Sequence, residues 1–338
     1  MTETATITDN SQSAVPAAPI LDTTSMNFSP TIVGSTTEFV AGERKPGVCY
    51  GTYAGDLLDE TFRFRVSFVE HDGRFEMHSH EYAELVIVLA GHAMHLTDLD
   101  NHPLETGDVV VINAGRKHGF AEAKGLRLCN IMYDPQQFLV SEHELETLAG
   151  YQALFELGPR SERPASFRER LHLSIQELAQ INTMLSALRQ ESERKDDGWK
   201  AVVRYQFLSM VAFVSRIYTR LRSDQATPLL QMARVVSYIQ QNYHTPIAVE
   251  QLAKLAHLSL CQFQRRFKRV HNQTPIQFVN NVRIHAACEM LKDPNNDVTH
   301  VAMATGFSTS AFFSAQFRRH MGESPSSYRR RFNTEMIA

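Results

Sequence analysis

Short runs in which apolar and polar residues alternate fill the segment from about residue 49 to residue 133. The apolar positions follow a period of two, which is the period of a strand with one buried face. Glycine-containing turns such as Gly107-Asp108 separate the runs. Several short strands at this spacing predict a β-sandwich or barrel. The expected strands are residues 62–68, 84–89, 108–112 and 126–132.

The apolar period becomes helical between about residues 167 and 222. Two stripes are separated by Lys-Asp-Asp-Gly at residues 195–198, which predicts two antiparallel helices packed on the barrel. The same stripes would also suit a dimer seam. The first stripe consists of Leu171, Ile175, Leu178, Ile181, Leu185 and Leu188, and the second of Phe207, Met210, Val211, Val214, Ile217 and Leu221.

An internal repeat with a shift of 49 to 50 residues organises the end of the chain. Phe263 and Phe267 recur as Phe313 and Phe317, and similar pairs keep this register on both sides of them. Each copy predicts a helix, a turn and a second helix: residues 249–256 and 260–270, then 298–305 and 309–320. Ser259 and Ser308 are the expected N-caps of the second helices, and Gly306 is the expected C-cap between 298–305 and 309–320.

The net charge of the C-terminal region, which contains the repeat, differs in sign from that of the rest of the chain. The chain of 338 residues has a net charge of -3, but residues 228–338 hold 13 Lys and Arg against 6 Asp and Glu, a net of +7. The remainder holds 21 against 31, a net of -10. A polyanion is therefore the expected partner of the C-terminal part. In a helix-turn-helix the second helix enters the major groove of double-stranded DNA, where Gln pairs with adenine and Arg with guanine.

Other features narrow the class of protein. No apolar run approaches the roughly 18 residues of a membrane span, and no secretory signal pattern opens the chain, so we expect a cytoplasmic protein without membrane contact. The four cysteines form no C-x-x-C pair, which argues against a cysteine zinc site or a disulfide framework. Residues 1–30, rich in Thr, Ser, Ala and Pro, predict a disordered leader.

Residues 249–330 resemble the AraC/XylS family of transcription regulators, which they match through Gly306-Phe307-Ser308, the Phe-Arg-Arg of residues 317–319 and the Tyr-Arg at 328–329. The resemblance implies seven helices, two reading helices in successive major grooves, and a joining helix that includes Arg283. The family usually has Arg where this chain has Ala315, so strong guanine readout by the second unit is not expected. The expected DNA contacts are Ser259, Cys261, Gln264, Arg265, Lys268 and Arg269 in the first unit, and Ser308, Ser310, Ser314, Arg318 and Arg319 in the second.

Four polar residues in the barrel segment resemble the cupin double motif: His78, His80 and Glu84, then His118 after Gly115. Positions 78, 80 and 84 are an even number apart, so on a strand they point to one face. In metal-binding cupins these four positions hold a metal ion. Sensors of the AraC type keep the same pattern in a barrel that binds a small effector, and residues 78–133 look most like the rhamnose-responsive members. Arg63, Arg65 and Asn130 are further effector-binding candidates.

The sequence thus predicts an α+β multidomain protein, with a cupin or jelly-roll β-barrel and a helical pair followed by an all-α domain with two helix-turn-helix units. The expected boundaries are 1–30 leader, 31–140 barrel, 141–222 helical packing or dimerisation region, 223–228 linker, and 229–338 DNA-binding domain. We expect a homodimeric transcription activator that contacts RNA polymerase, without a cofactor and without catalysis, controlled by a sugar or another polar metabolite. Two alternatives stay open: a metal-dependent cupin enzyme fused to a DNA-binding domain, with the four motif residues as ligands, and a ligand-free regulator controlled by a protein partner.

Overall fold

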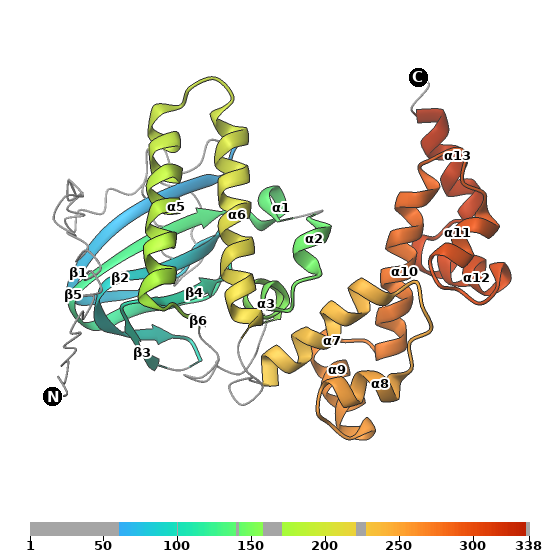
Figure 1. Cartoon of the computed structure of the whole chain (residues 1–338), viewed down its shortest axis with the longest axis horizontal. Helices are drawn as coiled ribbons and strands as arrows, with labels where there is room; N and C mark the ends of the chain where they lie inside the picture. The colour runs from blue at the N-terminus through green and yellow to red at the C-terminus, as the bar shows by residue number, and fades with distance from the viewer. Residues whose placement is uncertain (1–60, 100, 140–141, 158–170, 221–227, 336–338) are drawn as a thin grey trace, which may run out of the picture. The chain divides into compact units, whose positions relative to one another are not determined.

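The computed structural model describes residues 61–99, 101–139, 142–157, 171–220 and 228–335 (Figure 1). The leader predicted over residues 1–30 lies outside the described residues, as do residues 223–227 of the predicted linker. Pro228, the last residue of that linker, begins a helix.

The barrel region is one antiparallel sheet of six strands. They are β1 (Phe64–His78), β2 (Ala83–Thr97), β3 (Asn101–Glu105), β4 (Asp108–Ile112), β5 (His118–Tyr133) and β6 (Leu171–His172). The order is β1-β5-β2-β4-β6, and β3 pairs with β2 beside this path. The strands expected at residues 84–89 and 126–132 are parts of the long strands β2 and β5, which pair from Ala83↔Tyr133 to Thr97↔His118.

The long strands β2 and β5 lose their regular register between Val88 and Met94. Gly91 lies in this stretch at φ +77, and a Cβ built on it would lie 2.2 Å from the carbonyl oxygen of Gly125. Only glycine permits this backbone conformation together with so close an approach. Irregularities of this kind bend a sheet, and the two ends of β2 and β5 thereby contribute to one inner face.

The two faces of the sheet carry different cores. Val86, Val88, Phe120, Leu126 and Leu128 pack on the inner face. The alternate residues, among them Leu85, Ile87, Cys129 and Ile131, belong to the core shared with the helices. Phe62, Phe64, Val66 and Phe68 also join the helix side, which is where an alternating strand should place its apolar residues.

The helical pair consists of α5 (Ile175–Arg194) and α6 (Trp199–Thr219), which lie across the outer face of the sheet (Figure 1). Ser174 and Glu177 form a capping box that starts α5, and Lys195 and Gly198 take left-handed conformations in the turn. The expected stripe was wrong at its start: Leu171 lies in β6, and Ile175 is 83% exposed. Between β5 and β6 lie α1 (Pro135–Phe138), α2 (His143–Glu146), α3 (Ala149–Tyr151) and the π-helix η2 (Gln152–Leu157).

The C-terminal region contains seven described helices. They are α7 (Pro228–Asn242), α8 (Val249–Leu255), α9 (Leu260–His271), α10 (Pro275–Leu291), α11 (Val298–Ala304), α12 (Ser310–Met321) and α13 (Pro325–Glu335). The pairs α8–α9 and α11–α12 are the two predicted helix-turn-helix units, and α10 joins them. The expected fold class, with a cupin-type β region and an all-α C-terminal domain, is confirmed.

The repeat seen in the sequence is repeated in the packing. The rings of Phe263 and Phe267 are 5.5 Å apart, and those of Phe313 and Phe317 are also 5.5 Å apart. Phe267 meets Phe278 edge-on at 5.4 Å, as Phe317 meets Tyr328 at 5.4 Å. Each unit thus has its own aromatic core of the same design.

Candidate nucleic-acid interface and barrel site

The first helix-turn-helix unit presents α9 with one buried and one exposed face. Phe263 and Phe267 are fully buried, and the expected DNA contacts Cys261, Gln264, Arg265, Lys268 and Arg269 are all exposed. Ser259 begins the helix as predicted: its hydroxyl accepts from the Gln262 amide at 3.4 Å, while the Gln262 side chain accepts from the Ser259 amide at 3.3 Å. This capping box fixes the start of the helix that carries the side chains predicted to contact DNA.

The second unit differs from the expectation at its first residue. The N-cap of α12 is Thr309, whose hydroxyl accepts from the Phe312 amide at 3.1 Å. The assignment of this cap to Ser308 was therefore wrong, because α12 keeps the 50-residue shift of its own Phe313 and Phe317 and not the 49-residue shift of the helix before it. Ser308 is exposed just before the cap, and Ser310 and Ser314 are half-buried.

The exposed face of α12 is apolar at its N-terminal end. Ala311, Phe312 and Ala315 are exposed, with Phe312 at 45%, and Arg318 and Arg319 follow in the last turns. Sequence reasoning missed Phe312. The doublet Phe312-Phe313 carried the signal, since two adjacent residues of a helix lie about 100° apart and only one of them can face the core.

A buried polar cluster lies inside the barrel, where ends of β1, β2 and β5 meet. One ring nitrogen from each of His78, His80 and His118 lies within 4.8 Å of the other two. Glu84 lies between two of the imidazoles, with Oε1 3.5 Å from His80 Nε2 and Oε2 3.6 Å from His118 Nε2. The structure thus brings together all four residues of the predicted motif.

The hydrogen bonds around this cluster orient its imidazoles. His80 Nδ1 donates to the carbonyl oxygen of Tyr82 at 2.7 Å, and His78 Nδ1 donates to that of Glu76 at 3.1 Å. Each ring therefore turns an Nε2 lone pair away from the backbone carbonyl that it contacts. His80 Nε2 and Glu84 Oε2 are buried and form no hydrogen bond with any described residue. Leaving buried polar atoms without partners is costly unless a ligand completes them.

Burial inside the barrel favours the neutral form of two imidazoles, those of His118 and His78. Burial lowers the pKa of His118 well below its usual value, and the neighbouring His78, His95 and His80 lower it further. Burial also lowers the pKa of His78, an effect that Glu84 partly opposes. A neutral imidazole both ligates a metal ion and accepts a hydrogen bond from a hydroxyl.

Further imidazoles on the same wall were missed by the sequence reasoning. His95 is 2% exposed, its Nδ1 lies 3.0 Å from His102 Nε2, and its ring stacks on Phe120 at 5.4 Å. The ring of His71 also stacks on Phe120, with centroids 6.1 Å apart. The parity of His95 with Ala93 on β2 was the available signal, but the irregular register before residue 94 hides it.

The three weaker candidates for effector binding lie in different places. Asn130 lies on the inner face, paired in register with Val86, and its buried Oδ1 forms no hydrogen bond with the described residues. Arg65 shares this face by register, since its partner Met132 is also the partner of Glu84. Arg63 instead pairs with Asp134 at 3.4 Å at the edge of the sheet, so the structure does not bring it to the cluster.

A second group of potential metal ligands has a structural role. Asp108 accepts from the Glu105 amide at 2.9 Å and pairs with His172 Nδ1 at 2.9 Å. Because His172 belongs to β6 and Asp108 to β4, this pair fastens the last strand of the sheet.

Within the described residues, no helix has the length and apolar composition needed to cross a membrane.

Comparison with known proteins follows the division into two regions. The family model "Helix-turn-helix domain" matches residues 252–331, and the model "Cupin domain" matches residues 64–131. The chain is an AraC-family regulator. The predicted resemblance to this family is thereby confirmed.

Relatives of this AraC-family regulator are similar over most of its length. "HTH-type transcriptional activator RhaR" of Mannheimia succiniciproducens is 26% identical over 76% of this chain and 88% of its own. The protein of the same name from Yersinia pestis is 28% identical over 82% of this chain and 92% of its own. Among solved structures, the DNA-binding domain of AdpA in complex with a target DNA is 30% identical over 31% of this chain and 95% of its own, with a TM-score of 0.30. The regulator thus combines a helix-turn-helix domain with a cupin domain.

Proposed function

We propose that this regulator is a transcription activator and that a small polar effector bound inside the barrel controls it. The observation that carries the proposal is the convergence of His78, His80, Glu84 and His118, with buried polar atoms that the described residues leave without hydrogen bonds. A sugar is the first candidate, because each hydroxyl needs both a donor and an acceptor and this cluster offers three imidazoles and a carboxyl group. Asn130 and Arg65 would extend the contacts along the inner face.

A metal ion in the same cluster is the second candidate. Three imidazoles and one carboxylate form a ligand set that suits divalent transition metals. Metal-bound histidines typically donate their other ring N–H to a backbone carbonyl or a carboxylate, as His78 and His80 do to the carbonyl oxygens of Glu76 and Tyr82. When bound, such an ion would supply Lewis-acid chemistry, either to hold effector oxygens or, in the alternative reading as a cupin enzyme, to act on a substrate.

For the DNA-binding domain, we propose base readout by Cys261, Gln264 and Arg265 of α9 and by the exposed face of α12. Lys268, Arg269, Arg318 and Arg319 would neutralise phosphates, with Ser259, Ser308, Ser310 and Ser314 as shorter-range contacts. We also propose that the protein is a homodimer and contacts RNA polymerase. Its domains in this proposal are the barrel at residues 31–140, the helical packing or dimerisation region at 141–222 and the DNA-binding domain at 229–338.

The proposal is tested by ligand binding to the purified full-length protein. We expect a saturable rise in melting temperature with one member of a monosaccharide panel, measured with and without divalent metal ions, and loss of that rise in the His78→Ala/His80→Ala double variant. His92→Ala is the matched control, because His92 is exposed on β2 and its side chain alternates away from that of buried Ala93. Stoichiometric metal in protein purified without chelator, lost in the double variant, would favour the metal site. No response to any sugar or metal would refute control through this cluster.

A further inference from the structure

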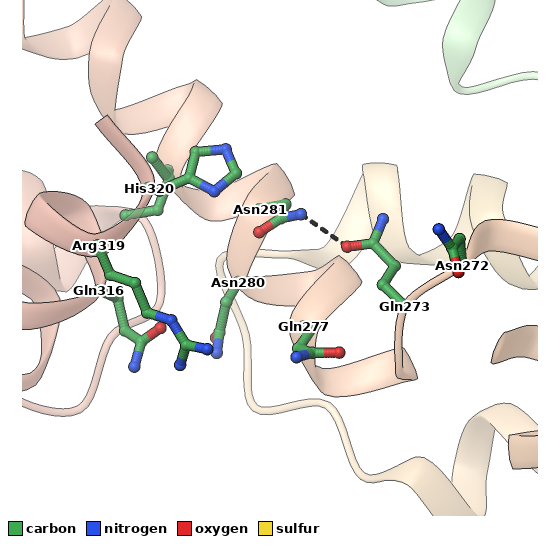
Figure 2. A pocket seen from close by; sticks show the side chains of 9 residues that line it. Asn272, Gln273, Gln277, Asn280, Asn281, Gln316, Arg319 and His320 are labelled. Atoms are coloured by element: carbon green, nitrogen blue, oxygen red, sulfur yellow. Dashed lines mark hydrogen bonds between the residues drawn. The ribbon is translucent and has the colours of Figure 1, made fainter. Parts of the chain in front are cut away.

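A polar cavity of about 230 Å³ lies between the two helix-turn-helix units, outside the predicted reading faces (Figure 2). Its floor is α10, with Gln277, Asn280 and Asn281, and Gln273 lies just before this helix. Gln316, Arg319 and His320 of α12 form the opposite wall. We propose that this cavity, which we call the inter-unit pocket, seats a backbone phosphodiester of the DNA between the two half-sites.

The chemistry of the inter-unit pocket suits an anion that only accepts hydrogen bonds. Of its nine lining residues, six carry carboxamides, one is Arg319, and none is acidic. Carboxamide NH₂ groups donate hydrogen bonds to phosphate oxygens, while the guanidinium of Arg319 supplies the opposite charge. A cation would find no carboxylate in this lining.

The volume of the inter-unit pocket favours a ligand group that belongs to a polymer. Pockets for drug-sized metabolites have volumes of roughly 300–1,000 Å³, and this cavity is smaller, at about 230 Å³. A phosphodiester enters such a cavity as one part of a larger ligand that lies across its mouth. The pocket is also partly pre-arranged, since Asn281 Nδ2 donates to Gln273 Oε1 at 2.7 Å (Figure 2).

The position of the inter-unit pocket favours DNA as this polymer. When two reading helices occupy successive major grooves, the sugar-phosphate backbones between these grooves must pass the segment that joins the units. That segment is α10, whose polar residues recur at positions 277, 280 and 281, on one side of the helix. Arg319 is exposed and lies one helical turn after Ala315 of the reading face of α12, so the pocket borders the surface that faces DNA.

The test uses the full-length protein and a duplex that the wild-type protein selects from random sequence. We expect one uncharged methylphosphonate between the half-sites to weaken wild-type binding about ten-fold, as loss of hydrogen bonds to a charged group should. In Asn280→Ala the same modification should cost nothing further. Asn280→Asp keeps the size of the side chain and places a carboxylate against the phosphate, so it should weaken binding more than Asn280→Ala does, in fluorescence anisotropy at fixed salt.

The control variant Asn295→Ala removes an exposed carboxamide outside the pocket and should bind as wild type, and circular dichroism would confirm that each variant is folded. Equal affinities of Asn280→Ala and Asn280→Asp, or a methylphosphonate effect that persists in Asn280→Ala, would overturn the proposal. A saturable stabilisation of the DNA-free protein by inorganic phosphate, abolished in Asn280→Asp, would instead place a free anion in the pocket. The inference rests on the proposed DNA binding by this domain, which selection of the duplex tests independently. A protein that selects no duplex would refute DNA binding itself, before any pocket variant is measured.

Discussion

Arg265 on α9 and Ala315 on α12 occupy equivalent places in the repeat, 50 residues apart, and both are exposed. A guanidinium there pairs with the O6 and N7 atoms of guanine, whereas a methyl group contacts only the apolar C5-methyl of thymine. The two units are therefore alike in fold and different in what their central side chains can read.

Replacing Arg265 tests the first reading helix. Arg265→Ala should cost about 1–3 kcal/mol of binding free energy and relax the preference at one base position. Lys268→Ala should instead weaken all sequences alike and lower the salt dependence, because it removes a phosphate contact. Anisotropy titrations with single-base variants of the selected duplex, at several salt concentrations, separate the two effects. Equal affinities of both variants and wild type would contradict this docking of α9.

Replacing Ala315 tests the second reading helix, α12. Ala315→Arg should create a guanine preference worth about 1–3 kcal/mol in the second half-site. In the wild type, exchange of thymine for deoxyuridine in that half-site should weaken binding, at about 0.8 kcal/mol for each methyl group that Ala311, Phe312 or Ala315 covers. Deoxyuridine placed outside both half-sites is the control. A second half-site that tolerates deoxyuridine without loss would show that α12 does not read thymine.

Elements are joined at a few positions where the backbone leaves no freedom. Gly306, between α11 and α12, has φ +85, and a Cβ on it would lie 2.6 Å from the carbonyl oxygen of Tyr243. Arg283 of α10 donates to the carbonyl oxygens of Tyr243 and Thr245, at 2.7 and 2.8 Å, and its guanidinium lies over the ring of Phe307 at 5.7 Å. These contacts tie the turn of the second unit to the segment after α7 and so help to fix the separation of the two units.

Gly306→Ala is expected to destabilise the DNA-binding domain. Gly322→Ala is its matched control, because Gly322 has a similar φ of +79 but nothing within 4 Å of a Cβ. The control should cost about 1–2 kcal/mol, the price of a left-handed conformation with a side chain. Gly306→Ala should cost more, since the backbone must also move apart. The free energies of unfolding from urea titrations give the comparison, and equal losses would mean that the approach to Tyr243 relaxes freely.

The sequence predicts a structural feature well when that feature depends on residues close together in the chain, and poorly when it depends on contacts that form only in the folded protein. Capping by Ser259 and the burial of the Phe pair in each copy of the repeat were predictable, because both depend on residues three or four positions apart. The length and bend of β2 and β5 were not, since the bend results from a close approach of Gly91 to Gly125 that only the folded sheet contains. Leu171 continued the apolar spacing of a helix yet pairs with β4, and the His95–His102 pair arises from the pairing of β3 with β2, a strand that the pattern did not reveal.

At the scale of the whole molecule, the buried imidazoles link stability to pH. The pKa of His118 in the folded protein lies well below its usual value because of burial and the nearby His78, His95 and His80. The unfolded chain therefore binds more protons below about pH 6.5, the ordinary pKa of histidine. The stability that His118 contributes is complete above that pH and is lost as the pH falls towards the folded pKa.

We expect the melting temperature of metal-free protein to be nearly constant from pH 7 to 8 and to fall below about pH 6.5. The fall should be smaller in His118→Gln, while His92→Gln, which replaces an exposed histidine of β2, should follow the wild type. Calorimetry across this range gives the measurement. A slope below pH 6.5 that is identical in His118→Gln and wild type would exclude His118 as its source.

The unequal chemistry of the two reading helices gives the DNA-binding domain a direction. If α9 recognises polar base edges and α12 recognises methyl groups, a duplex with its half-sites exchanged is a different ligand, even though its composition is unchanged. Each DNA-binding domain would then fit its binding sequence in one orientation only. The order of the half-sites in the promoter would decide which end of the regulator points towards the start of transcription.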